Sequence, residues 1–300
     1  MSTAVGPTAN VSPLSAWLLA IRPKTLPAAI SPVLVGCAVA WAENKFDLVA
    51  ALAAFAVALL LQIGANFAND VADFRRGADS DDRLGPLRVT QGGLISPRHV
   101  VVATALVLIA AVAPGLYLVW RGGPALAVLG LLAIAAAVTY TAGPKPFGYL
   151  GLGELFVFIF FGPVAVVGTS FVMTHSVTRL ALLASIAMGS LVTAILVVNN
   201  LRDIASDLAA GKRTLAVRIG RRATRWEYTV LIAVAYAMPA VMWWELSDLG
   251  PLVAWTTIPM AIQLVRQVWD GGGRGLNPVL GGTARLCLWF AVTLGTGLIL

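Results

Sequence analysis

The sequence has few charged residues, and acidic residues are the scarcest of them. Of its 300 residues 12% are charged and 59% are hydrophobic, with 14 Asp and Glu against 21 Lys and Arg. Ordinary soluble domains carry about 25% charged residues, so this composition excludes a soluble domain. It also excludes a soluble nucleic-acid-binding protein, in spite of the net charge of +7.

Cysteine and histidine are nearly absent. The two cysteines, Cys37 and Cys287, both lie within apolar runs, which argues against a disulfide framework and against a cysteine metal cluster. His99 and His175 have no partner at the spacing of a metal site, and we interpret them as surface or interface residues.

Long hydrophobic runs dominate instead. They are roughly 16 to 24 residues long, the length that crosses a hydrocarbon core as a helix. The sequence therefore predicts an all-α, polytopic membrane protein, with about nine transmembrane helices in one domain over 1–300. We expect a central cavity that opens to the cytoplasmic side. The predicted spans are 26–41, 48–68, 100–120, 124–141, 150–173, 180–201, 228–244, 249–265 and 285–300.

The polar stretches predict the parts outside these spans. Residues 1–12 are predicted to be a disordered tail, and 74–99 and 202–225 are predicted to be cytoplasmic cap loops. When the connections are assigned alternately to the two sides, eighteen of the twenty-one Lys and Arg fall on one side. The positive-inside rule makes that side cytoplasmic and predicts a multi-pass protein of the plasma membrane. Within the spans, Gly36, Gly64 and Gly130 are expected to allow close packing of helices.

Two acidic clusters stand out against this background. Asn66, Asp70 and Asp73 follow an apolar run at i, i+4 and i+7, so a helix would present them on one face. Asn199, Asp203 and Asp207 repeat this arrangement downstream. Seven of the fourteen acidic residues lie within 66–83 and 199–207.

Carboxylates at the membrane end of a helix are costly unless they are hydrated, paired or bound to metal. Aspartate oxygens suit Mg²⁺, and phosphate oxygens can complete its coordination while Arg and Lys hold the same anion. The pair of clusters therefore predicts a Mg²⁺-dependent diphosphate site at which the diphosphate is the leaving group. The alternative is that both clusters are solvated loop acids that balance neighbouring arginines. The match between the two clusters, at equivalent helix ends, favours the diphosphate site.

These motifs resemble those of the UbiA superfamily of intramembrane aromatic prenyltransferases, and most closely the branch that acts on 1,4-dihydroxy-2-naphthoate in menaquinone biosynthesis. The resemblance covers 22–220. It rests on the two Asn/Asp motifs and on RPKTL at 22–26, DRLGPLR at 82–88, YT at 140–141, GYLGLGE at 148–154 and GKRT at 211–214.

The resemblance implies transfer of a polyprenyl group from polyprenyl diphosphate to 1,4-dihydroxy-2-naphthoate, with loss of CO₂ and diphosphate. The implied metal ligands are Asp70, Asp73, Asp79, Asp203 and Asp207, and the implied catalytic residues are Asp70, Asp73, Asp203, Asp207, Tyr140 and Lys145. The expected substrate-binding residues are Asn66, Asn199, Arg202, Lys212, Arg22, Lys24 and Glu154.

The chain departs from the superfamily pattern at two points. Position 74, where the first motif often has its last aspartate, is Phe, so Asp73 or Asp79 would supply that carboxylate. Tyr140 and Lys145 are one residue further apart than in the Tyr-x₃-Lys pattern. Two other functions stay open: a sister enzyme with 4-hydroxybenzoate, homogentisate or a tetrapyrrole as acceptor, and a membrane transporter or lipid-binding protein.

Overall fold

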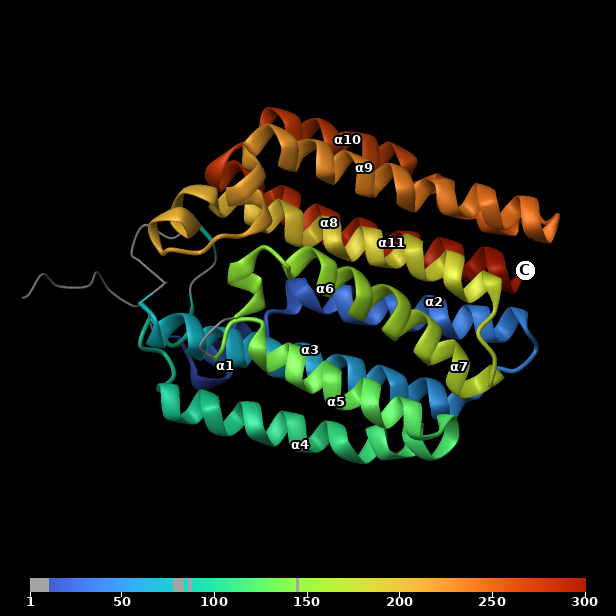
Figure 1. The fold of residues 1–300 in the computed structure, drawn as a ribbon, viewed down its shortest axis with the longest axis horizontal. Coiled ribbons are helices and arrows are strands. Elements are labelled where there is room, and N and C mark those ends of the chain that lie inside the picture. The colour runs from blue at the N-terminus through green and yellow to red at the C-terminus, as the bar shows by residue number, and fades with distance from the viewer. Residues whose placement is uncertain (1–10, 78–83, 86–87, 144–145) are drawn as a thin grey trace, which may run out of the picture.

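The computed structural model describes residues 11–77, 84–85, 88–143 and 146–300. Within these ranges the chain forms helices and no strands, which confirms the all-α prediction. The long helices run side by side along one direction (Figure 1). Of the expected tail 1–12, only Val11 and Ser12 are among the described residues.

The α-helices are α1 (Pro13–Ile21), α2 (Leu26–Ala42), α3 (Leu48–Arg75), α4 (Pro97–Gly122), α5 (Pro124–Thr139), α6 (Gly153–Ile159), α7 (Gly168–Thr174), α8 (Arg179–Ala209), α9 (Leu215–Leu246), α10 (Ile258–Asp270) and α11 (Asn277–Ile299). Short segments of tighter or wider helix join them: η1 (Pro23–Thr25), η2 (Phe147–Leu150), η3 (Phe160–Val167), η4 (Gly250–Thr257) and η5 (Gly273–Leu276).

Local sequence explains where several of these helices begin. Asp47 accepts a hydrogen bond from the backbone N–H of Ala50 at 2.9 Å, which caps α3. Hydroxyl side chains cap other helices in the same way, and proline follows directly after two of the caps, where its missing N–H costs nothing. These hydroxyl caps are Ser12, Ser96, Thr178 and Thr214.

Helix α8 lies at the centre of the bundle. It packs against α9, η3, α2 and α11, and the largest apolar core cluster is built around it.

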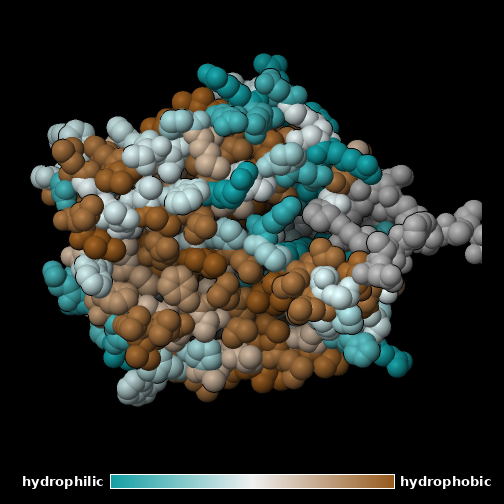
Figure 2. Space-filling view, turned by 180° about the vertical axis from the view of Figure 1, so that it is seen from behind, coloured by the Kyte–Doolittle hydropathy of each residue, from teal (hydrophilic) through white to brown (hydrophobic). Residues whose placement is uncertain are grey.

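Helices α3, α4 and α5 lie at one side and leave many large apolar side chains exposed, such as Leu106, Ile109 and Leu131. In Figure 2 brown, apolar side chains cover much of the face shown, and teal side chains gather near the end where the grey residues lie. This is the surface of a protein that faces lipid.

Seven helical stretches of the described chain are long and apolar enough to cross a membrane, which confirms a polytopic membrane protein. The predicted span 124–141 corresponds to α5, which has 16 residues and is shorter than these seven. The predicted span 249–265 falls on η4 and α10. The last helix is longer than predicted, because α11 begins at Asn277, so Arg285 lies within the helix rather than at its start. The count of nine spans stays a prediction.

The predicted cap loop at 202–225 is wrong over most of its length. Helix α8 continues to Ala209 and α9 begins at Leu215, so only 210–214 lies between them. Polar side chains do not end a helix by themselves; here Gly211, with φ +72°, turns the chain and Thr214 caps the next helix. Asp203 and Asp207 therefore lie on an unbroken helix. The other predicted loop, 74–99, does lie largely between α3 and α4.

The glycine predictions separate into two groups. A Cβ atom on Gly36 would lie 2.7 Å from Thr169 Cβ and 2.7 Å from the backbone oxygen of Val166, and one on Gly64 would lie 2.8 Å from Leu108 Cδ2. Both glycines thus allow close packing, as predicted. The prediction for Gly130 is wrong, since nothing lies within 4 Å of its added Cβ.

We therefore expect Gly36→Ala to destabilise the protein and Gly130→Ala not to. Overpacking a buried contact typically costs about 1–3 kcal/mol. Thermal denaturation of the purified protein in detergent should give a lower midpoint for Gly36→Ala, and an unchanged or higher one for Gly130→Ala, because alanine favours helix. Equal midpoints for Gly36→Ala and the wild type would contradict this prediction, because they would mean that α2 and η3 can move apart without a loss of stability.

Candidate active site

The first acidic face lies at the end of α3, on the side that points into the protein. Asn66, Asp70 and Asp73 are 4%, 2% and 2% exposed, so the predicted spacing does put them on one buried face. Asn66 donates its amide to the backbone oxygen of Ile21 at 2.8 Å and to Thr25 Oγ1 at 3.0 Å. It therefore joins α3 to the chain between α1 and α2.

Asp70 is compensated from two sides. One carboxylate oxygen accepts a hydrogen bond from the backbone N–H of Thr90 at 3.0 Å. The other lies 3.7 Å from a guanidinium nitrogen of Arg22. The structure thus brings Arg22 to the site. Lys24 is exposed and forms no ion pair with any residue that the structure describes.

Asp73 contacts three separate stretches of chain. Its Oδ2 accepts a hydrogen bond from Arg88 at 2.8 Å, and its Oδ1 accepts one from the Tyr149 hydroxyl at 2.7 Å and one from Lys212 Nζ at 3.2 Å. Lys212 Nζ also lies 4.6 Å from the centre of the Tyr149 ring, and the Arg76 guanidinium lies 5.1 Å from it. Two cations and a phenol thus compensate one buried carboxylate.

The Tyr149 hydroxyl is a firmly protonated donor in this network. Burial raises the pKa of this phenol well above its usual value, and the negative charge of Asp73 raises it further. Tyr149 therefore donates to Asp73 throughout the physiological pH range.

The second acidic face lies at the end of α8 and is organised by Arg202. This arginine is 2% exposed, and its Nε and one terminal nitrogen donate to the two carboxylate oxygens of Asp203 at 2.7 and 2.5 Å. It also donates to the Oδ1 atoms of Asn199, at 2.9 Å, and Asn277, at 3.0 Å. Asn277 in turn donates to the backbone oxygen of Leu84 at 2.9 Å. Arg202 therefore ties α8 to α11.

Asp207 differs from the other three aspartates. Its side chain is partly exposed and makes no hydrogen bond or ion pair with the described part of the chain. Its backbone oxygen accepts from the N–H of Lys212 at 2.8 Å, while the Lys212 side chain reaches Asp73. Lys212 thus connects the two acidic faces, which meet at the same end of the bundle (Figure 1).

Tyr140 follows α5 and lies between the two faces. Burial raises the pKa of its phenol far above the usual value, and the negative charges of Glu154, Asp207 and Asp73 add to the effect. Gly148 and Gly153 leave room for Tyr140, because a larger side chain at either position would press against it. A Cβ on Gly148 would lie 2.7 Å from the backbone oxygen of Tyr140, and one on Gly153 would lie 3.2 Å from its hydroxyl.

Glu154 is buried beside Tyr140. Its Oε1 accepts a hydrogen bond from Asn200 Nδ2 at 2.7 Å, while its Oε2 is buried without a hydrogen-bond partner in the described ranges. Two of the predicted site residues, Lys145 and Asp79, lie outside the described residues.

The arrangement of the carboxylates bears on metal binding. Among the residues that the structure describes, no three His, Cys, Asp or Glu side chains converge closely enough to hold one ion. Three of the four aspartates are instead paired with arginine or lysine. The donors themselves fit a hard cation such as Mg²⁺, since all four are carboxylates. Each paired aspartate would have to exchange its cationic side chain for the metal.

Sequence reasoning missed several partners of these residues. Tyr149 was included only within the 148–154 motif, and Thr90, Asn200 and Asn277 were not singled out. Asn200 directly follows a predicted site residue, which is a usable signal. Asn277 is 75 positions from Arg202 and carries no pattern that links the two.

The fold and site define a polytopic helical membrane protein with two aspartate-bearing helix ends that meet at a cation-rich site. The chain belongs to the UbiA prenyltransferase family, whose model matches residues 29–273. It is 43% identical to the 1,4-dihydroxy-2-naphthoate octaprenyltransferase of Mycobacterium tuberculosis, over 94% of this chain and 96% of that protein. It is 40% identical to the enzyme of the same name from Escherichia coli, over 86% and 85% of the two chains.

Solved structures agree on the fold. The apo structure of a UbiA homolog from Aeropyrum pernix K1 superposes with a TM-score of 0.70 at 17% identity, covering 89% of this chain and 96% of that one. A UbiA homolog from Archaeoglobus fulgidus bound to DMAPP and Mg²⁺ superposes with a TM-score of 0.64 at 16% identity, covering 93% and 99%.

The buried position of Arg202 predicts a large effect of its removal. Removing one partner of a fully buried ion pair typically costs about 3–5 kcal/mol. The Asp203 side chain is 15% exposed, so water compensates part of its charge and the loss should fall below that range. We expect Arg202→Met to lower the thermal midpoint markedly in detergent, and the double variant Arg202→Met/Asp203→Asn to regain part of the loss. Arg213→Met, which removes an exposed arginine of the same region, is the control. An Arg202→Met midpoint equal to that of the control would contradict this account.

Proposed function

We propose that this protein transfers a polyprenyl group from polyprenyl diphosphate to 1,4-dihydroxy-2-naphthoate, releasing diphosphate and CO₂ and giving the reduced form of demethylmenaquinone. The observation that carries the proposal is the junction at Lys212, whose backbone contacts Asp207 and whose side chain contacts Asp73. Relatives at 38–43% identity, each matched over more than four fifths of both chains, are named 1,4-dihydroxy-2-naphthoate octaprenyltransferases, which supports the choice of acceptor.

The cations of the site are our candidates for binding the diphosphate. Arg22, Arg88, Arg202 and Lys212 all contact carboxylates in the structure, so they already point toward the centre of negative charge. Asp70, Asp73, Asp203 and Asp207 would hold Mg²⁺, which when bound neutralises charge on the departing diphosphate. The arginines and lysine that leave these carboxylates would then donate to phosphate oxygens, since charge-assisted hydrogen bonds to phosphate are strong.

Tyr140 and Glu154 are our candidates for the reacting end of the site. The Tyr140 phenol stays neutral, so its ring face can stabilise an allylic cation without reacting with it. The naphthoate ring would attack that cation, and loss of its carboxylate as CO₂ would restore aromaticity. Glu154, with one buried unpaired oxygen, would accept a hydrogen bond from an acceptor hydroxyl. Arg22 and Lys24 are the two residues near the first span that could hold the naphthoate carboxylate instead of the diphosphate, and of these only Arg22 contacts a site carboxylate, Asp70, among the described residues. Lys145 remains a candidate for the diphosphate from the sequence alone.

The positively charged residues at the site indicate which side of the membrane the site faces. The cationic residues of the site lie at the same end of the bundle as Arg75, Arg76 and the arginines that begin α9. The positive-inside rule makes this end cytoplasmic, in a multi-pass protein of the plasma membrane. The cavity would then open toward the cytoplasm, where a diphosphate substrate is made.

A transporter is the weaker alternative. Proton or ion pathways place acidic residues near the middle of spans. The four aspartates here lie in the last turns of α3 and α8, next to arginine and lysine, which favours an anionic ligand.

The assay that tests the proposal uses the purified protein in detergent with Mg²⁺, a polyprenyl diphosphate and 1,4-dihydroxy-2-naphthoate. We expect a prenylated naphthoquinol, no product after chelation of the metal, and a loss of roughly 100-fold or more in Asp73→Ala and Asp203→Ala. The exposed Glu245→Gln is the matched control and should keep full activity. Product from 4-hydroxybenzoate instead would overturn the acceptor, and no product from any acceptor would overturn the reaction.

Tyr149→Phe tests the role of the network around Asp73. The variant keeps the ring under Lys212 but removes one hydrogen bond to the carboxylate. Hydrogen bonds to charged groups contribute about 1.5–3 kcal/mol, so we expect kcat/KM to fall by roughly 10-fold or more. Tyr117→Phe, whose hydroxyl bonds to no described residue, is the control. A Tyr149→Phe enzyme as active as this control would remove Tyr149 from the site.

A further inference from the structure

A groove lies on the face of α3 opposite the acidic residues. At 100° per residue, Ala68, Ala72 and Arg75 project about half a turn away from Asp70 and Asp73. The groove runs between α3, α4 and the turn after α5, and has a volume of about 400 Å³. Small-molecule sites typically have about 300–1,000 Å³, so this one can hold a ligand segment.

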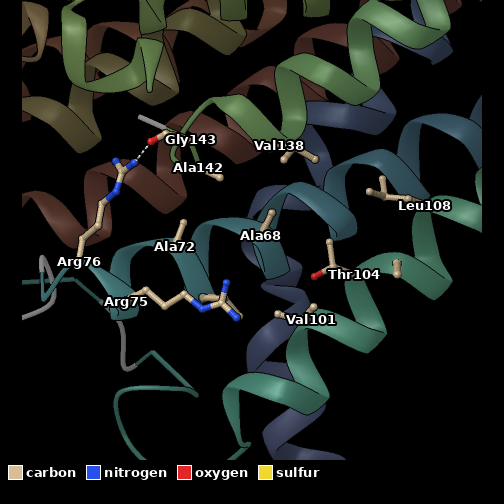
Figure 3. A pocket seen from close by; sticks show the side chains of 12 residues that line it. Ala68, Ala72, Arg75, Arg76, Val101, Thr104, Leu108, Val138, Ala142 and Gly143 are labelled. Atoms are coloured by element: carbon tan, nitrogen blue, oxygen red, sulfur yellow. Dashed lines mark hydrogen bonds between the residues drawn. The ribbon is translucent and has the colours of Figure 1, made fainter. Parts of the chain in front are cut away.

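The walls of the groove are apolar. They are formed by Ala68 and Ala72 of α3, by Val101 and Leu108 of α4, and by Val138 of α5 (Figure 3). Thr104 also lines the groove, but its hydroxyl donates to the backbone oxygen of Val100 at 2.8 Å and is therefore satisfied. A ligand in this groove would contact hydrocarbon over most of its length.

Among the described residues that line the groove, Arg75 is the strongly polar side chain that is free to bind. It is exposed, and it makes no hydrogen bond or ion pair with any residue that the structure describes. Its guanidinium lies between α3 and α4, over the apolar wall (Figure 3). The other arginine of the groove, Arg76, donates to the backbone oxygen of Gly143 and is not free in this way.

Two contacts hold the turn after α5 against α3 at the edge of the groove. The Thr141 hydroxyl donates to Asn69 Oδ1 at 2.6 Å, and Arg76 binds the oxygen of Gly143. Both contacts join the end of α3 to the turn after α5, whose Ala142 and Gly143 line the groove.

We propose that this groove binds an anionic phospholipid of the surrounding bilayer, with one acyl chain along Ala68, Ala72 and Leu108 and the phosphate on Arg75. Helices α3 and α4 expose apolar side chains to lipid on this side, so an acyl chain is the molecule that meets the groove. An arginine at the edge of the hydrocarbon attracts a lipid phosphate, and an anionic headgroup adds to this attraction. The inference does not rest on the proposed reaction.

Native mass spectrometry of the detergent-purified protein tests the proposal. The protein is incubated with phosphatidylglycerol or phosphatidylcholine of the same acyl chains, and bound lipid is counted. We expect phosphatidylglycerol to be retained preferentially and Arg75→Gln to weaken its binding about fivefold, the effect of one surface cation. Arg98→Gln removes an exposed arginine at the start of α4, outside the groove, and should leave binding unchanged.

Two further variants separate the lipid from other occupants. Ala72→Leu should reduce lipid binding by filling the groove, and Arg75→Lys, which keeps the charge, should preserve most of it. Equal retention of the two lipids, or unchanged phosphatidylglycerol binding in both Arg75→Gln and Ala72→Leu, would overturn the proposal. Displacement of the lipid by a polyprenyl diphosphate would assign the groove to the substrate, and displacement by inorganic phosphate alone would reduce it to a phosphate site. Circular dichroism and a single size-exclusion peak confirm that each variant is folded.

Discussion

The compensation of the buried carboxylates at the end of α3 is the constraint on which the rest of the site depends. A carboxylate taken out of water costs several kcal/mol unless it is paired and hydrogen-bonded. Asp73 is paired and hydrogen-bonded by Arg88, Tyr149 and Lys212, which come from three different connections between helices. These connections therefore converge over the same end of the bundle.

The central position of α8 determines where the second acidic face lies. Its apolar stretch is largely buried among α2, η3, α9 and α11, which fixes the rotation of the helix about its axis. Since Asn199, Asp203 and Asp207 continue the same helix, that rotation also decides where their side chains point. Arg202 then binds Asn277 of α11, so the last helix, which carries none of the sequence motifs, still helps to position the site.

The features that depend only on the local periodicity of the sequence could be predicted from it. Apolar runs predicted the helices, and the spacing of Asn66, Asp70 and Asp73 predicted their shared face. Prediction failed where the outcome depends on contacts distant in sequence or on turn geometry. The pairing of Arg202 with Asn277 crosses 75 positions, and the extent of α8 into the predicted loop depends on Gly211 and Thr214 rather than on polarity. Gly130 looked like Gly36 in sequence, yet it faces open space because no helix packs against it.

Helix α3 faces two environments, the polar site on one side and the lipid on the other. Neighbouring residues on a helix differ by about 100° in direction, so Asp73, Arg75 and Arg76 diverge although they are almost adjacent in sequence. Asp73 points into the polar site, Arg76 lies over the Tyr149 ring that binds Asp73, and Arg75 lies in the groove on the lipid side. Arg76 thus contacts both the Tyr149 ring and Gly143, which lies at the edge of the groove. The polar site and the lipid surface are thus joined by a single turn of helix.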